Sequence, residues 1–288
     1  MVRISLLLSL LLLPGWALAQ TFLWNVSKGD QHLTLGGTIH LLTAEDYPLP
    51  NEFEQAYQQA NTLVFETDIQ ALSQPQIQQQ MTQRMMLQPG QSLPAMLNDE
   101  ARQALIKYLE SSPLSMDQLR DFSPQWVSLV ITVTELHRLG MSEEGVAAYS
   151  DRRARQHVKS IKELESVIEQ LEFIATMAEG RESELILQTV ADTRILAQQM
   201  DGLRLAWRQG DREQLRQLGL DPMRKDYPKV YQSLVVKRNQ NWLPQIEQLL
   251  QSGQHPLVLV GALHLVGPDG LLQQLQQRGY TITYYGDK

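Results

Sequence analysis

The chain has 288 residues, of which 43% are hydrophobic, so it is long enough to bury a core without covalent crosslinks. Its 32 acidic residues outnumber its 25 basic ones, and a net charge of −7 without a long basic run argues against a nucleic-acid-binding protein. Because there is no cysteine, disulfides, cysteine-ligated metals and thiol nucleophiles are all excluded.

Residues 1–19 are typical of a secretory signal peptide. Arg3 supplies a positive start, an almost unbroken apolar run follows from Ile4 to Leu13, and Ala17-Leu18-Ala19 ends in small residues. The run is too short for a spanning helix, which needs about 20 apolar residues. We therefore expect an exported, periplasmic protein whose mature part begins near Gln20 and has no stable membrane span.

The mature N-terminus is expected to form a β-hairpin, since alternating runs over 22–26 and 32–35 flank a glycine-containing turn. The second run leads into Gly36-Gly37-Thr38-Ile39-His40. A helix is expected over 51–60. After it, Leu63-Val64-Phe65 is a short apolar run suited to a buried strand.

The segment from about residue 69 to 252 is expected to be mostly helical, because apolar residues recur at three- and four-residue spacing. The expected helices cover residues 101–110, 124–139, 161–178, 182–208 and 231–250. Strand character returns over 256–260, followed by a helix over 268–277 and a last strand over 280–285. A strand, helix and strand of this length are typical of a βαβ unit, so we expect these two strands to pair in parallel.

These elements predict an α/β fold with a mixed central sheet built from the N- and C-terminal segments of the chain. Residues 20–288 would form a single domain, with a long helical insertion over about residues 69–252.

Two Gly-x-x-His motifs, Gly37-Thr38-Ile39-His40 and Gly261-Ala262-Leu263-His264, each follow a β-rich run. Glycine allows a sharp turn there, which places each histidine just beyond the carboxyl end of a strand, where open parallel sheets bind ligands. Glu66 stands in the same relation to the strand over 63–65. A single such histidine is more often structural, but the repetition of the motif favours function.

Two imidazoles and one carboxylate are a common ligand set for a catalytic divalent metal with an open coordination position. His40, Glu66 and His264 are therefore candidate ligands for a metal that would activate water and polarise a carbonyl group. The His-Glu-x-x-His motif of zinc proteases and the Gly-x-Ser-x-Gly elbow of α/β serine hydrolases are absent. We assign the other histidines and most tryptophans to packing or to the surface: His32, His137, His157, His255, Trp24, Trp126, Trp207 and Trp242.

With these motifs the chain resembles the TraB/GumN family, which is related to the Tiki metalloproteases and more distantly to erythromycin-esterase-like and ChaN-like proteins. The resemblance covers almost the whole mature chain. Besides the two Gly-x-x-His motifs, its segments are Leu23-Trp24, Val64-Phe65-Glu66-Thr67-Asp68, Gly145-Val146-Ala147-Ala148-Tyr149, Leu164-Glu165-Ser166 and Arg238-Asn239. This chain departs from the family pattern at Ala147, where the family has an acidic residue.

The resemblance implies a fold of two pseudo-repeat halves with an active site between them. In Tiki-like members it also implies a protease that uses a divalent metal of the manganese, cobalt or zinc class. It adds three residues to the site that the pattern alone does not select. Glu165 would be a general base or further ligand, and Arg238 and Asn239 would orient ligands or hold a carbonyl oxygen.

The sequence thus predicts an exported metal-dependent hydrolase that acts on a peptide or on a small molecule. Two alternatives remain open. One is a binding protein for haem or another small ligand, held by His40 or His264 with Tyr47 or Tyr149 as a phenolate. The other is an interaction protein with a vestigial site, whose helical insertion forms the working surface.

Overall fold

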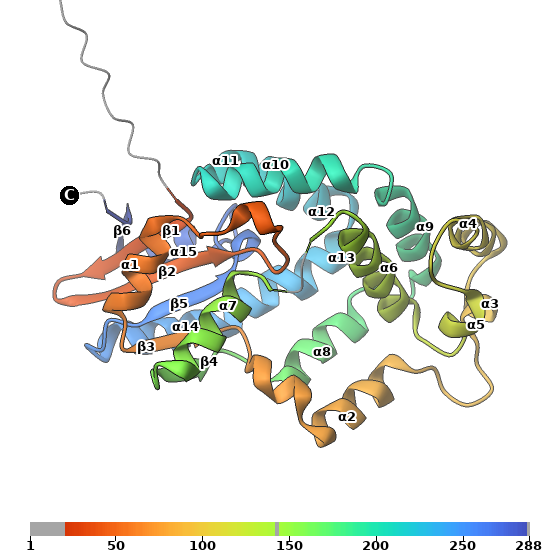
Figure 1. Cartoon of the computed structure of the whole chain (residues 1–288), viewed down its shortest axis with the longest axis horizontal. Helices are drawn as coiled ribbons and strands as arrows, with labels where there is room; N and C mark the ends of the chain where they lie inside the picture. Colours follow the sequence, from red (N-terminus) through yellow and green to blue (C-terminus); the bar gives the residue numbers. More distant parts are fainter. Residues whose placement is uncertain (1–20, 142–143, 287–288) are drawn as a thin grey trace, which may run out of the picture.

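The computed structural model describes residues 21–141 and 144–286 (Figure 1). The predicted signal peptide, residues 1–19, lies outside these residues. Among the described helices, none combines the length and apolar character needed to cross a membrane.

A six-stranded mixed sheet forms one end of the molecule, with the strand order β4-β3-β5-β2-β1-β6 (Figure 1). The strands are β1 (Leu23–Lys28), β2 (Gln31–Thr38), β3 (Thr62–Phe65), β4 (Ser160–Glu163), β5 (Leu257–Gly261) and β6 (Thr281–Tyr284). The neighbours β4, β3, β5 and β2 are parallel, whereas β1 pairs antiparallel with both β2 and β6. The predicted mixed α/β fold is therefore confirmed.

β5 lies in the middle of the sheet and joins the two ends of the chain. It pairs Leu259 with Phe65 of β3 and Gly261 with Thr38 of β2. All five of its residues are buried, as expected for a strand that is covered on both faces. The C-terminal segment thus completes a sheet begun by the N-terminal one.

The helix predicted over 161–178 is wrong in its first part. Ser160–Glu163 form β4, and helix α8 (Val167–Thr176) begins only after Ser166. β4 is a short, mostly exposed edge strand, so it has no alternation of buried residues to mark it as a strand. Its pairing with β3 decides its structure, which is an effect of tertiary context rather than local propensity.

The predicted pairing of the last two strands is also wrong. β6 pairs antiparallel with β1, for example Tyr284 with Trp24, and β2 and β1 separate it from β5. β6 still runs in the same direction as β5, because the connection through α15 (Leu271–Gln277) crosses past the β1–β2 hairpin.

The main hydrophobic core lies between the sheet and the helices packed against it. These helices are α1 (Asn51–Gln59), α7 (Val146–Gln156), α10 (Leu196–Arg208), α11 (Arg212–Leu215), η3 (Arg216–Leu220), α12 (Asp221–Asp226), α13 (Pro228–Tyr231), η4 (Gln232–Lys237), α14 (Arg238–Gln251) and α15. Short 3₁₀ turns are η1 (Ala44–Asp46), η2 (Ile69–Ser73) and η5 (Ala262–His264).

The opposite end of the molecule is helical and has two smaller cores of its own (Figure 1). The helices around them are α2 (Pro75–Met85), α3 (Leu93–Met96), α4 (Asp99–Leu109), α5 (Met116–Leu119), α6 (Pro124–Arg138), α8 and α9 (Glu182–Asp192). The predicted insertion is thus largely helical, and β4 is the strand within it that the prediction missed.

Candidate active site

Four adjacent parallel strands each lead into one residue of the predicted site. In the order of the sheet, Glu165 follows β4, Glu66 follows β3, His264 follows β5 and His40 follows β2. The backbone N–H of Glu165 donates to the carbonyl oxygen of Glu66 at 2.9 Å, which extends the β3–β4 pairing past the strand ends. The carboxyl edge of the parallel strands therefore collects all four side chains.

His40, Glu66 and His264 converge beside Gly261. A β-carbon on Gly261 would lie 3.1 Å from Oε1 of Glu66, 3.4 Å from Cδ2 of His264 and 3.6 Å from Nε2 of His40. A side chain at this position would crowd all three groups. The two Gly-x-x-His motifs, more than two hundred residues apart in the sequence, thus meet in space as predicted.

The guanidinium of Arg238 lies at the centre of the buried part of the site. Its Nη2 donates to Oε2 of Glu66 at 2.6 Å and to Oε1 of Glu165 at 2.7 Å, and its Nε also contacts Glu165. Its Nη1 lies 3.1 Å from Nε2 of His264. Burial lowers the pKa of Arg238, but the two carboxylates outweigh that effect and raise it. One permanent cation thus holds two buried carboxylates.

Glu66 is held in its ionised form. Burial by itself would raise the pKa of Glu66, but Arg238, His264, His40 and the N–H of Gly261 together lower it to about 2. The Gly261 N–H donates to Oε1 of Glu66 at 2.6 Å, so both carboxylate oxygens have a partner. Glu66 therefore carries a negative charge at neutral pH, directly beside the two histidines.

His264 is held neutral and in one tautomer. A guanidinium can only donate, so Nε2 of His264 accepts from Arg238, and Nδ1 carries the proton that it donates to Oδ1 of Asn239 at 2.8 Å. Burial and the charge of Arg238 lower the pKa of His264 to about 3. Asn239 also donates to the carbonyl oxygens of His264 and Asp269, so it fixes both the ring and the loop behind it.

Trp242 belongs to this cluster, although the sequence pattern assigned it to packing. The side chain is fully buried, and its Nε1 donates to Oε2 of Glu165 at 3.0 Å. Its ring lies 4.6 Å from the Arg238 guanidinium and 4.5 Å from the His264 ring. Arg238 and Trp242 are four residues apart and share one face of α14, a spacing that points to Trp242 once Arg238 is known.

His40 is the exposed member of the set, and its backbone is tightly held. The N–H of Val146 donates to the carbonyl oxygen of Ile39 at 3.1 Å. A β-carbon on Gly145 would lie only 2.2 Å from the carbonyl oxygen of His40. The start of α7 can therefore approach this turn only with glycine at position 145. This close packing explains the glycine, and it does not require a ligand role for Ala147, two residues further on.

The loop after His40 is anchored to α10. Arg204 forms two hydrogen bonds with the buried carboxylate of Asp46 and one with Thr43. Burial opposes ionisation of Asp46, but its bonds to Arg204 and Thr43 lower its pKa. An ionised Asp46 thus fixes the loop that follows His40 to α10.

The predicted metal-ligand set does not fit a divalent ion in this arrangement. Nε2 of His264 and Oε2 of Glu66 both face the guanidinium of Arg238, and the other Glu66 oxygen accepts from Gly261. Within residues 21–141 and 144–286, no three side chains of His, Cys, Asp or Glu are grouped so that they could hold a metal ion. The guanidinium would repel a second cation placed here, so the positive charge of this site is Arg238.

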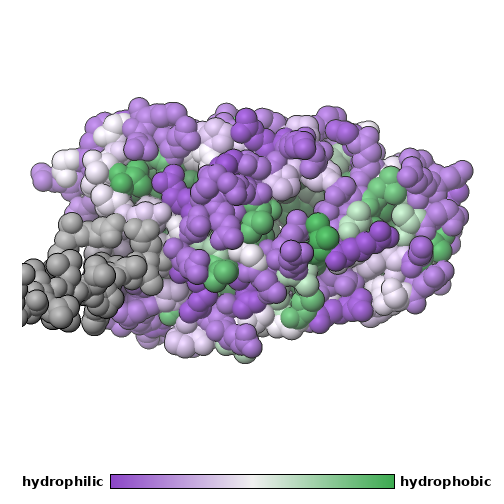
Figure 2. Space-filling model, turned by 90° about the horizontal axis from the view of Figure 1, so that it is seen from above, coloured by the Kyte–Doolittle hydropathy of each residue, from purple (hydrophilic) through white to green (hydrophobic). Residues whose placement is uncertain are grey.

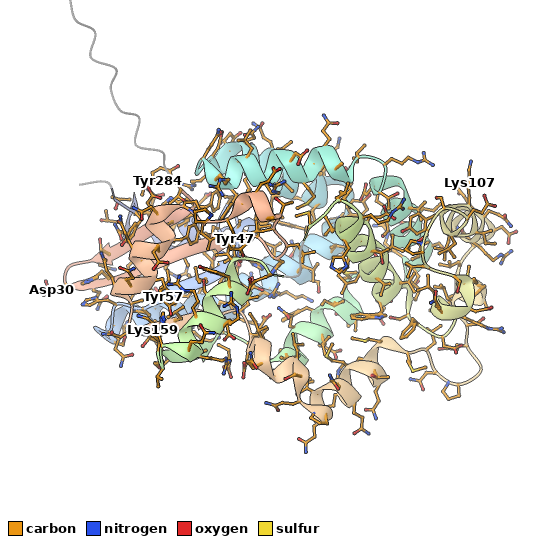
Figure 3. The ribbon with its side chains drawn as sticks, viewed as in Figure 1. Asp30, Tyr47, Tyr57, Lys107, Lys159 and Tyr284 are labelled. Atoms are coloured by element: carbon orange, nitrogen blue, oxygen red, sulfur yellow. The ribbon has the colours of Figure 1, made fainter. Side chains whose placement is uncertain are left out.

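Tyr47, proposed above as a phenolate for haem, is a hydrogen-bond donor in this structure. Its hydroxyl donates to the carbonyl oxygen of Glu144 at 2.9 Å, and burial together with Glu144 raises its pKa to about 12. Figure 3 shows Tyr47 close to α7, where its ring packs 5.2 Å from that of Tyr149. A protonated, hydrogen-bonded Tyr47 does not supply a phenolate at neutral pH.

The buried site should make the protein less stable as the pH falls below about 6.5. Unfolded chains protonate histidine near pH 6.5, whereas folded His264 stays neutral to about pH 3, so acid favours the unfolded state. Glu66 causes a further loss of stability below pH 4.5, because its pKa is lowered from 4.5 in the unfolded chain to about 2 in the folded protein. Urea unfolding between pH 7 and 4 measures this, and His264→Gln should flatten the first decline. A wild-type stability equal at pH 7 and pH 5 would contradict the description of His264.

Comparisons with known proteins identify a family that matches this chain. The family model of the TraB/PrgY/gumN family matches residues 22–284. The chain is similar to the uncharacterized protein YbaP of Escherichia coli (strain K12), with 24% identity over 257 residues, 86% of this chain and 89% of that protein. It is similar to the same extent to the uncharacterized protein YbaP of Shigella flexneri. No solved structure matches the chain significantly.

Proposed function

Because the chain belongs to the TraB/PrgY/gumN family, we propose that it is an exported hydrolase that cleaves a peptide bond. One observation supports this proposal most directly: the exposed imidazole of His40 lies beside the ionised carboxylate of Glu66 at the carboxyl edge of the sheet. An exposed base next to a fixed anion is a common arrangement for activating water. The signal-peptide pattern of residues 1–19 supports the proposed export to the periplasm.

His40 is the general base in this proposal. Nε2 of the buried His264 already accepts from Arg238, whereas His40 is open to solvent. Neutral His40 takes a proton from water as the water oxygen attacks the carbonyl carbon, and the imidazolium then gives that proton to the leaving amine. Glu66 stabilises the imidazolium between these two steps, which is the part that a carboxylate plays beside a catalytic histidine.

The other buried residues of the site position this pair. Arg238 keeps Glu66 ionised and fixes its orientation, while Glu165 and Trp242 hold the guanidinium from the other side. Asn239 sets the tautomer of His264, so that Nε2 faces Arg238. Each buried polar group of this set has a partner, as a preorganised site requires.

The peptide bond is the proposed substrate because the Tiki-like proteins that the chain resembles are proteases. Those proteins use a divalent metal. The chemistry proposed for this chain uses none, because Arg238 faces the atoms that would bind one. We therefore propose peptide hydrolysis that does not depend on a metal. The hydrolysis and its independence of metal are two parts of the proposal, and each can fail without the other.

Incubation of the purified protein with a mixture of unstructured peptides, followed by mass spectrometry of the products, tests both parts. We expect cleavage that persists at the same rate in excess EDTA and does not increase when Mn²⁺, Co²⁺ or Zn²⁺ is added. Loss of cleavage in EDTA with recovery on adding a metal would overturn the metal-free mechanism. Absence of cleavage under all these conditions would overturn the peptidase.

A further inference from the structure

A second candidate site lies outside the cluster around Arg238. It is a cavity of about 860 Å³ between the end of α10, the α11–α12 segment, the loop after His264 and β6. Tyr284 of β6 lines it and donates to the carbonyl oxygen of Gly210 at 3.2 Å. Figure 3 shows Tyr284 at the sheet end of the molecule, and Figure 2 shows a largely hydrophilic face over α10 and α11. The volume of the cavity lies within the range of small-molecule sites, about 300–1,000 Å³.

Three arginines line this cavity: Arg212, Arg216 and Arg224. Arg216 is neutralised, because it forms ion pairs with Glu213 and with Asp221. The other two arginines form no ion pair or hydrogen bond with any residue in the described part of the chain.

Two acidic residues, Glu213 and Asp211, also line the cavity. Glu213 is bound through both oxygens to Arg216, and it also accepts from Gln217. Asp211 caps the following turn by accepting from the N–H of Gln214. Together with Asp221, these carboxylates balance the three arginines in number. What favours an anion here is that the hydrogen-bond donors of Arg212 and Arg224 are not used within the described part of the chain.

The cavity is distinct from the candidate active site but shares a loop with it. None of His40, Glu66, Glu165, Arg238 or His264 lines it. Val266, Gly267 and Pro268, which do line it, begin two residues after His264. The cavity and the active site therefore share the loop that Asn239 fixes through the carbonyl oxygens of His264 and Asp269.

We infer that this cavity binds a small molecule that carries two or more anionic groups, either phosphates or carboxylates. Arginine is suited to both, because its planar guanidinium forms paired hydrogen bonds with their oxygens. Arg212 and Arg224 are the two groups that bind the anions, and Tyr284 borders the space between them and the sheet. The inference is independent of the proposed hydrolysis.

Isothermal titration calorimetry with inorganic pyrophosphate and with citrate, at low ionic strength, tests this inference and distinguishes phosphate from carboxylate ligands. The variants are Arg212→Gln and Arg224→Gln, neither of which removes an internal ion pair. The matched control is Lys225→Gln, which removes the same charge from an exposed neighbour of Arg224 that is not among the cavity-lining residues.

We expect one of the two anions to bind the wild type with a stoichiometry of one. Each arginine variant should weaken that binding by about tenfold, the loss of one charge-assisted contact, and Lys225→Gln should leave it unchanged. Absence of binding by both anions would overturn the inference. Equal weakening by all three variants would also overturn it, because it would show attraction to surface charge rather than a site.

Discussion

Replacing Arg238 by methionine is expected to lower the free energy of unfolding by about 3–5 kcal/mol at neutral pH. The substitution keeps a long apolar side chain against Trp242 but removes the cation that Glu66 and Glu165 share. Both carboxylates lie in the buried part of the site, so each would be left without its counter-charge. Urea unfolding followed by circular dichroism measures the effect.

Lys237→Met is the matched control, because Lys237 is the exposed neighbour of Arg238 on the same helical segment. That change should alter the free energy of unfolding by no more than about 0.5 kcal/mol. Adding Glu66→Gln and Glu165→Gln to Arg238→Met should recover part of the lost stability, since the buried negative charges are then gone. If Arg238→Met is as stable as the wild type, the guanidinium does not hold the two carboxylates.

Replacing His40 by alanine is expected to reduce peptide hydrolysis by about 10²–10⁴-fold, the usual contribution of a general base. Because the His40 side chain is exposed and has no described hydrogen bond to lose, stability should change by less than about 0.5 kcal/mol. The measurements are initial rates with a fluorogenic unstructured peptide and urea unfolding of the same preparations.

His32→Ala is the control for this variant, since His32 is also exposed and lies at the opposite end of β2. It should leave the rate unchanged. A His40→Ala protein that cleaves at the wild-type rate would remove His40 from the mechanism. That result would leave the description of the buried cluster unaffected, because Arg238→Met tests the cluster and His40 lies outside it.

The convergence of His40, Glu66 and His264 was predictable from the sequence because its signal is local. His40, Glu66 and His264 each follow a short apolar run, and the rule that parallel strands present ligands at their carboxyl edge places them together without coordinates. Glu165 obeys the same rule, but it was reached only through the family resemblance. The reason is physical: its strand, β4, lies at an exposed edge and has the composition of a helix surface.

The environment of each group was not predictable in the same way. A sequence shows that Arg238 is charged, but not that it points at Nε2 of His264 and at Oε2 of Glu66. Those contacts depend on the packing of α14 against the strand ends. Because of them, residues that look like a metal-ligand set in the sequence form an arginine–carboxylate cluster in the structure. Trp242 was missed for the same reason, since its polar contact is made by one nitrogen of an otherwise buried ring.

The position of β5 has a consequence for the order in which the molecule becomes complete during synthesis. β5 is the strand that connects β3 with β2, yet it is encoded by residues 257–261 of a chain of 288. A nascent chain that ends before this strand has two separate pairs, β1–β2 and β3–β4, and lacks His264. The ribosome must therefore synthesise β5 before the four strand ends can assemble, so translation products that end before residue 257 lack the site.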